Sequence, residues 1–92
     1  QVNKNTLKTQ RVRQKRTLFI KELKKKPCTD CATSYPYYVM DFDHCRGEKL
    51  FEIGDSIKNP VSMVRLLEEL EKCDLVCSNC HRERTHRRRM ES

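Results

Sequence analysis

Two Cys-x-x-Cys pairs constrain this chain more than any other feature of its sequence. The first pair is Cys28 and Cys31, and the second is Cys77 and Cys80. A gap of two residues lets both thiolates of a pair reach one ion, and four thiolates are a usual ligand set for structural zinc. Residues 32–76 separate the pairs, far more than the roughly 15–20 residues of a simple zinc ribbon. Zinc is therefore expected to tie the beginning of a domain to its end.

The small size of the chain favours a stabilising metal of this kind. The sequence has 92 residues, of which 36% are hydrophobic and 36% charged, and it contains no Trp. One small domain with so thin a core is marginal without added support. Zinc is expected to supply much of the folding free energy. One Cys-x-x-Cys alone can be a redox dithiol, but two pairs favour metal over a disulfide framework.

Two further cysteines, Cys45 and Cys73, fall outside the pairs. They are expected to be small buried hydrophobic residues, with a disulfide between them as the less favoured interpretation. The first 26 residues are polar and basic and lack the apolar run of a signal peptide. No stretch approaches the roughly 20 apolar residues of a membrane span. We therefore expect a cytoplasmic protein in a reducing compartment, with no membrane partner.

The charges are unevenly distributed along the chain. Residues 1–26 hold ten Lys or Arg and one acid, residues 27–80 hold five and ten, and residues 81–92 hold five and two. Two cationic ends therefore flank an acidic middle within a net charge of +7. Such ends suit a polyanion, because each neutralised phosphate releases condensed counterions. A solvated charge run is the alternative for either end alone.

Three helices are expected from composition and periodicity. Residues 5–25 contain no Gly or Pro and are rich in helix formers, and Pro27 ends the pattern. The C-terminal part of this helix should pack on the domain while its N-terminal part stays basic and exposed. Residues 63–72 form an amphipathic pattern with Ser62 as the N-cap. Residues 81–90 indicate a final basic helix.

Two strands are expected between these helices. Residues 37–44 are aromatic and partly alternating, which is typical of a strand. Residues 46–49 indicate a turn, and residues 50–53 a second short strand that would complete a hairpin. Residues 54–60 are expected to be loop.

One combination of residues resembles a known family. Met40-Asp41-Phe42-Asp43-His44, followed by Cys77-Ser78-Asn79-Cys80-His81-Arg82-Glu83-Arg84-Thr85, is similar to the HNH endonucleases. The specific feature is an Asp-His pair between two Cys pairs, with a His directly after the last Cys. The likeness covers about residues 28–85. It implies a small α+β fold with a ββα-metal (His-Me finger) core braced by a four-cysteine zinc over 27–92, preceded by a basic helix or arm over 1–26.

The resemblance also implies roles for individual residues. His44 would be the general base, since an imidazole titrates near neutral pH. Asp43 and His81 would hold one divalent cation, expected to be Mg²⁺ or Mn²⁺, although a His ligand also suits Ni²⁺ or Zn²⁺. A regular strand sends Asp43 and His44 to opposite faces, so both reach one site only if the chain turns at His44.

One position of the family pattern is not matched. The middle Asn of these nucleases usually precedes the second Cys pair by several residues and orients the loop of the base, but Lys72, Cys73 and Asp74 occupy that stretch here. Asn79 is the possible orienting residue, with capping of the last helix as its other role. His86 follows His81 by about 140° around a helix and is expected to face away from the cation.

The sequence therefore predicts a monomeric or homodimeric DNA endonuclease of bacterial or phage origin. Basic residues would grip the DNA backbone without reading its sequence; those expected to do so are Lys24, Lys25, Lys26, Arg82, Arg84, Arg87 and Arg88. The alternative is a non-catalytic zinc-binding nucleic-acid module, which has no need of the Asp-His pair and His81. A zinc-based protein adaptor is a third possibility, but it leaves both cationic ends unexplained.

Overall fold

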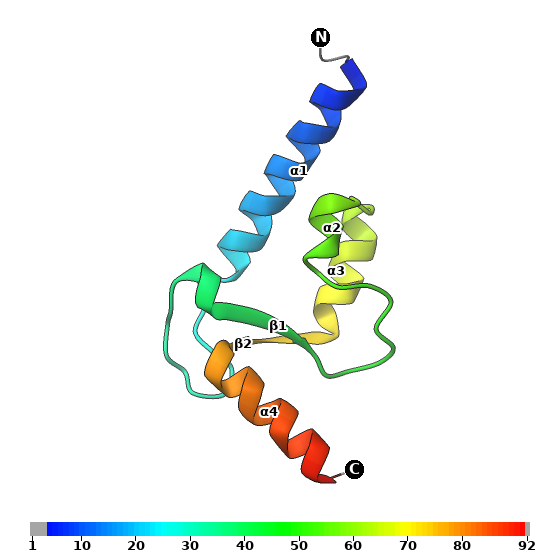
Figure 1. Ribbon diagram of the computed structural model, residues 1–92. Helices are drawn as coiled ribbons and strands as arrows, with labels where there is room; N and C mark the ends of the chain where they lie inside the picture. The colour runs from blue at the N-terminus through cyan, green and yellow to red at the C-terminus, as the bar shows by residue number, and fades with distance from the viewer. Residues whose placement is uncertain (1–3, 92) are drawn as a thin grey trace.

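The computed structural model describes residues 4–91, with side chains from residue 10 onward, as a small α+β fold (Figure 1). Its elements, in order, are α1 (Lys4–Leu23), the 3₁₀ turn η1 (Tyr37–Val39), β1 (Met40–His44), α2 (Asp55–Lys58), α3 (Met63–Glu71), β2 (Cys73–Cys77) and α4 (Ser78–Glu91). None of the helices in the described part of the chain is long and apolar enough to span a membrane.

The sheet consists of β1 and β2, which run antiparallel with Met40 opposite Cys77 and His44 opposite Cys73. The predicted hairpin between residues 37–44 and 50–53 is wrong. Residues 50–53 lie in irregular chain, and β1 instead pairs with a strand that follows α3. Burial explains the choice, because Val76 and Cys77 of β2 are almost completely buried once they lie beside β1.

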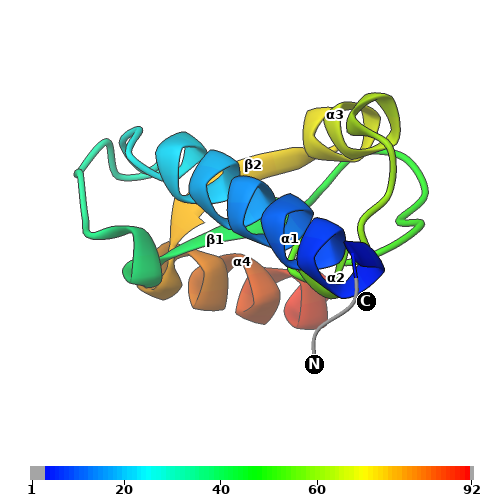
Figure 2. The same ribbon diagram turned by 90° about the horizontal axis from the view of Figure 1, so that it is seen from above.

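The two strands lie between α4 on one face and α1 and α3 on the other (Figures 1 and 2). Side chains directly opposite each other in an antiparallel pair share a face, and successive side chains alternate. Phe42 therefore points toward α1 and α3, where it packs on a core cluster. The buried members of that cluster are Ile20, Ile53, Leu66 and Cys73. Asp41 and Asp43 point the other way, toward α4.

Helix α1 ends at Leu23, and a turn leads to Pro27. Its C-terminal part packs on the domain as predicted, because Ile20 is buried and Arg16 donates a hydrogen bond to the Val61 carbonyl at 2.5 Å. The N-terminal end of α1 extends away from the rest of the molecule in Figure 1. The predicted exposure of side chains 4–9 lies outside the described side chains.

The remaining elements follow the sequence pattern with three differences. The first is that the predicted strand over 37–44 begins only at Met40, because Tyr37–Val39 form the 3₁₀ turn η1. Ser62 caps α3 as predicted, accepting a hydrogen bond from the Arg65 backbone N–H at 3.2 Å. The predicted loop over 54–60 contains the short helix α2. Helix α4 begins at Ser78, earlier than the predicted 81, so the second Cys pair lies where β2 passes into α4.

Candidate metal centre and active site

The four paired cysteines come together from both ends of the domain. Cys28 and Cys31 lie in the turn after α1, Cys77 ends β2, and Cys80 lies in the first turn of α4. Their sulfur atoms all lie within 4.8 Å of one another, and Cys31 and Cys77 are 4.0 Å apart. Four sulfurs at about 2.3 Å from a tetrahedral zinc lie about 3.8 Å from each other. The cluster therefore fits a structural zinc, with no need for large movements.

Backbone hydrogen bonds stabilise the thiolate forms of these cysteines, which are the forms that bind metal. The Cys77 N–H donates to Cys28 Sγ at 3.3 Å, and the Cys80 N–H donates to Cys77 Sγ at 3.5 Å. Burial raises the pKa of the Cys28 thiol, but hydrogen bonds from the backbone of Cys31, Cys77 and Asp30 outweigh burial and lower that pKa to about 6. Zinc binds the thiolate form, so this environment favours metal binding.

The two cysteines outside the pairs differ from each other. Cys73 is buried in the core, as predicted, and burial raises the pKa of its thiol to about 11. Cys45 is exposed, so the prediction that it is buried is wrong. It lies just past the end of β1, where the chain leaves the sheet. Both are free thiols, as are the four paired cysteines.

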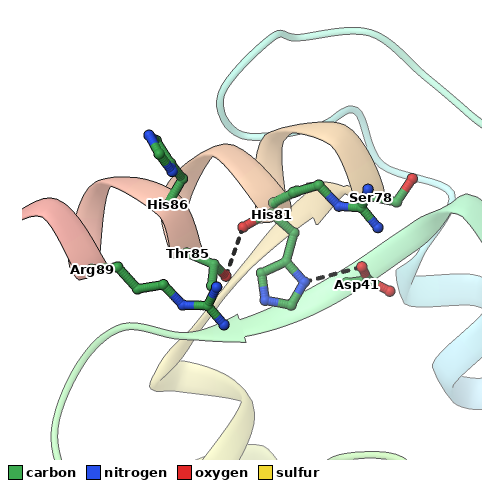
Figure 3. A pocket seen from close by; sticks show the side chains of 7 residues that line it. Asp41, Ser78, His81, Thr85, His86 and Arg89 are labelled. Atoms are coloured by element: carbon green, nitrogen blue, oxygen red, sulfur yellow. Dashed lines mark hydrogen bonds and ion pairs between the residues drawn. The ribbon is translucent and has the colours of Figure 1, made fainter.

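A second cluster lies on the face of the sheet that α4 covers. His81 Nδ1 lies 3.1 Å from Asp41 Oδ2 (Figure 3), and His81 Nε2 lies 3.5 Å from Asp43 Oδ1. Strand alternation places both carboxylates on one face, and the first turns of α4 bring His81 over them. The structure thus brings together the two predicted cation ligands. Asp41 was missed by the sequence analysis, although its i, i+2 relation to Asp43 on a strand could have indicated it.

Two arginines of α4 occupy the Asp43 carboxylate. Arg88 binds it through two hydrogen bonds of 2.8 and 2.6 Å, and Arg84 binds it at 2.9 Å. The hydrogen bonds from Arg88, together with those from Arg84, outweigh burial and lower the pKa of Asp43 to about 2. The side chain of Asp43 is only 3% exposed. Asp43 is therefore a buried anion that already has cationic partners.

Arg84 is the centre of an ion-pair network that spans the domain. It binds Asp30 through two hydrogen bonds of 2.7 and 2.6 Å and lies 3.0 Å from Asp74, in addition to Asp43. These three carboxylates raise the pKa of the Arg84 guanidinium. Asp30 lies between the first two cysteines, so the network joins the metal cluster to both strands. Arg84 was predicted to contact DNA, but here it is 15% exposed and paired within the protein.

His44 lies on the other face of the sheet, opposite to Asp43. Its Nε2 atom is 3.0 Å from Glu69 Oε2 of α3, and its side chain is 11% exposed. The turn at His44 that would bring both residues to one face does not occur there, because His44 still pairs with Cys73. The chain turns one residue later, where the Cys45 N–H donates to the Lys72 carbonyl at 2.9 Å.

Asn79 does not orient His44. It is exposed in the first turn of α4, and within residues 4–91 its side chain makes no hydrogen bond. Glu69 was not considered in the sequence analysis, because a Glu in an amphipathic helix is ordinarily a solvated residue. Its burial among donors follows from the tertiary arrangement, and hydrogen bonds from Lys72 and Leu50 outweigh burial and lower the pKa of its carboxyl.

The predicted DNA contacts fall into two groups. Lys25 pairs with Glu22 at 2.8 Å, Lys24 lies 5.5 Å from the centre of the Phe42 ring, and Lys26 is exposed. These three lysines follow α1 directly. The second group lies on α4. Arg82 and Arg87 are exposed there, and Arg88 is also 47% exposed although its guanidinium binds Asp43.

A pocket of about 470 Å³ opens beside the His81 cluster. Its lining residues are Asp41, Ser78, His81, Arg82, Thr85, His86 and Arg89. Figure 3 shows His81 directed toward Asp41 and β1, while His86 projects from α4 in a different direction. Carboxylate, imidazole and guanidinium groups thus share one open, polar hollow, which suits an anionic ligand and a cation more than an apolar one.

Comparison of the chain with protein-family models, with curated proteins and with solved structures gives no match.

Proposed function

We propose that this chain is a metal-dependent endonuclease of the HNH type that hydrolyses phosphodiester bonds in DNA. The observation that carries the proposal is the distance of 3.5 Å between His81 Nε2 and Asp43 Oδ1. A strand carboxylate and a helix imidazole at this distance can share one divalent cation, whose neighbouring ligands lie about 3 Å apart. Two antiparallel strands and the helix α4 surround that pair, which is compatible with the ββα core that the resemblance implies, although α2 and α3 separate the strands in the chain.

The cation would stabilise negative charge on the scissile phosphate and on the departing oxygen. Asp43 and His81 hold it in this proposal, and Asp41 orients the His81 ring through Nδ1 at 3.1 Å. Asp43 must exchange Arg88 for the cation. The guanidinium of Arg88 is half exposed, so a DNA phosphate at the pocket can become its new partner.

His44 takes a proton from the attacking water. The water oxygen forms a bond to phosphorus, the bond from phosphorus to the leaving sugar oxygen breaks, and that oxygen takes up a proton from solvent. His44 and Asp43 are the last two residues of β1. Because the two side chains lie on opposite faces, the proposal requires the scissile phosphate to bind around this end of the sheet, where it can contact one residue from each face.

Exposed basic residues position the DNA. Arg82 lines the pocket, Arg87 is exposed elsewhere on α4, and Lys26 continues a basic segment at the end of α1. Contacts of this kind go to phosphates, so they fix the register of the duplex without reading its sequence. The four-cysteine zinc holds α4 and both strands in place.

Plasmid cleavage tests the proposal. Protein stripped of loosely bound cations should nick or linearise supercoiled plasmid only after Mg²⁺ or Mn²⁺ is added. His44→Ala should abolish most cleavage at unchanged folding, zinc content and DNA affinity, because a base acts in the transition state. His81→Ala should lose activity through weaker cation binding, so that excess Mn²⁺ restores part of it. Wild-type cleavage rates in His44→Ala would disprove the role of this residue.

One observation favours a second candidate, a zinc-binding nucleic-acid module without catalysis. Both oxygens of Asp43 are held by Arg84 and Arg88, which is a complete structural role for a buried carboxylate. Such a module would bind DNA with equal affinity in the presence and absence of Mg²⁺, and it would not nick plasmid. The same assay therefore separates the two candidates.

A further inference from the structure

His44 and Glu69 form the most buried pair of a histidine and a carboxylate in the described part of the chain. The atoms His44 Nε2 and Glu69 Oε2 lie 3.0 Å apart, and the side chains are 11% and 1% exposed. His44 is the last residue of β1, and Glu69 lies in the last two turns of α3. Two rigid elements therefore fix the pair, which is what a precise orientation requires.

Besides the imidazole of His44, two donors hold the Glu69 carboxylate. Lys72 Nζ donates to Oε1 at 2.9 Å, and the Leu50 backbone N–H donates to Oε2 at 3.1 Å beside the imidazole. A buried carboxylate without partners is strongly unfavourable, whereas this one is satisfied at both oxygens. Glu69 can therefore remain an anion that only accepts hydrogen bonds.

We infer that Glu69 is a positioning residue for His44, which fixes the imidazole ring and its tautomer for general-base chemistry. This inference rests on the proposed nuclease function. A neutral imidazole has one donor and one acceptor nitrogen, and a carboxylate can only accept. Nε2 consequently carries the hydrogen that faces Glu69, and the lone pair of Nδ1 is left to take the proton from water. The same carboxylate then stabilises the imidazolium that forms.

The Ser-His-Asp proteases show how much such a pairing contributes. In those enzymes the carboxylate that holds the histidine sets its tautomer, and replacing the acid with its amide lowers kcat on the order of 10⁴-fold. Glu69→Gln makes the same change here with little loss of volume. We expect kcat for plasmid nicking to fall on the order of 10²–10⁴-fold, with KM for DNA nearly unchanged.

A purely structural role for Glu69 makes a different prediction. If Glu69 served only to pair with Lys72, then Lys72→Met would reduce kcat as much as Glu69→Gln does. A positioning role leaves Lys72→Met much more active, because the contact with His44 remains. Glu68→Gln is the matched control, since it makes the same change at the neighbouring, exposed position of α3. It should cleave at the wild-type rate.

Nitrogen NMR of histidine-labelled protein gives a readout that does not depend on cleavage. In the zinc-loaded full chain, His44 should be the Nε2–H tautomer at a pH where the ring is neutral, and Glu69→Gln should shift the population toward Nδ1–H. Glu68→Gln should leave the spectrum of His44 unchanged. A wild-type His44 that carries its hydrogen on Nδ1 would overturn the inference even if Glu69→Gln failed to fold.

The outcomes separate the inference from the function on which it rests. If the wild-type chain cleaves plasmid and Glu69→Gln keeps its kcat, Glu69 is not a positioning residue, and the nuclease proposal stands. If Glu69→Gln and Lys72→Met lose activity equally, the role of Glu69 is structural. If the wild-type chain cleaves nothing with any divalent cation, the nuclease proposal fails and the inference fails with it.

Discussion

The two faces of the β1–β2 sheet bury ionisable groups in opposite ways. On the face toward α4, Asp43 is surrounded by charge and pairs with His81, Arg84 and Arg88. On the face toward α1 and α3, the neighbouring residue His44 meets one carboxylate beside an apolar cluster. Two consecutive residues thus lie in contrasting environments, one suited to a cation and phosphate and the other to an oriented imidazole.

This contrast shows how a protein with a small hydrophobic core can hold both environments. In the proposed nuclease, the ionic face, which is the one toward α4, can change partners, because the half-exposed guanidinium of Arg88 can exchange a carboxylate for a phosphate. The other face is fixed by packing, since Leu66 is completely buried against the sheet. In the proposed nuclease, the cation site that assembles on DNA and the base that stays oriented would therefore occupy opposite faces.

The largest expected effect comes from disrupting the four-cysteine cluster, which is compatible with a zinc that would hold both faces together. Cys28→Ser or Cys80→Ser should unfold the domain, because a structural zinc contributes on the order of 10 kcal/mol in small domains and this core cannot replace it. Zinc content by elemental analysis and helicity by circular dichroism report the loss together. Cys45→Ser is the matched control, since Cys45 is exposed and outside the cluster, and it should keep both. A folded wild-type chain that contains disulfides and no zinc would contradict this prediction.

The next largest effect is expected from a substitution on the face of the sheet toward α4. Asp43→Asn should lower the free energy of unfolding by about 2–4 kcal/mol, because the amide replaces a buried carboxylate that pairs with both Arg84 and the half-exposed Arg88. Asp41→Asn changes a 44% exposed carboxylate on the same face, and it should cost less than about 1 kcal/mol. Denaturant unfolding near neutral pH compares the two variants. Equal losses in the two would show that burial does not distinguish these carboxylates.

The pH dependence of that contribution has a definite sign. The pKa of Asp43 is lowered from 3.8 to about 2, so its stabilisation is complete above pH 3.8 and is lost as the pH falls toward 2. Zinc binding by the four cysteines also depends on pH, because zinc binds their thiolate forms. Neutral pH is therefore the condition in which Asp43 can be measured on a folded, zinc-loaded protein.

The sequence predicted the parts of this molecule that depend on local chemistry. Cysteine spacing identified the cluster, composition identified α1, and Ser62 identified the start of α3. Asp43 and His81 were paired through the resemblance, and the structure places them 3.5 Å apart. The first three of these predictions depend on residues near one another in sequence or on a spacing specific to metal ligands, whereas the pairing of Asp43 with His81 depends on the resemblance.

The parts that the sequence did not predict depend on contacts between distant segments. Local alternation favoured a hairpin with residues 50–53, whereas burial of Val76 selected β2 as the partner of β1. Glu69 has the sequence surroundings of a solvated helical charge, and only the approach of β1 to α3 gives it His44 as a partner. Arg84 belongs to a basic run, and only the folded chain shows three carboxylates around it.

A smaller effect concerns the basic segment that follows α1. Replacing Lys24, Lys25 and Lys26 with Ala should weaken DNA binding about equally on unrelated sequences and flatten its dependence on salt. Each lost phosphate contact lowers the slope of log affinity against log salt by about 0.9. The triple variant of Lys49, Lys58 and Arg65 to Ala makes the same change in net charge in the acidic middle of the chain. Equal slopes in the two triple variants would show that the three lysines act only through the net charge of the protein and not through phosphate contacts of their own.

The smallest effect tests whether Arg88 and a cation compete for Asp43. In the absence of DNA, Arg88→Met should strengthen Mn²⁺ binding several-fold, because it frees one carboxylate oxygen while Arg84 still holds the other; a tenfold gain would correspond to about 1.4 kcal/mol. Arg87→Met is the matched control, since Arg87 is exposed on the same helix and makes no hydrogen bond to Asp43 in the described chain. Electron paramagnetic resonance of free Mn²⁺ measures both affinities. Equal strengthening in the two variants would attribute the gain to net charge, whereas a gain confined to Arg88→Met would show that the ionic face exchanges its arginine for a cation.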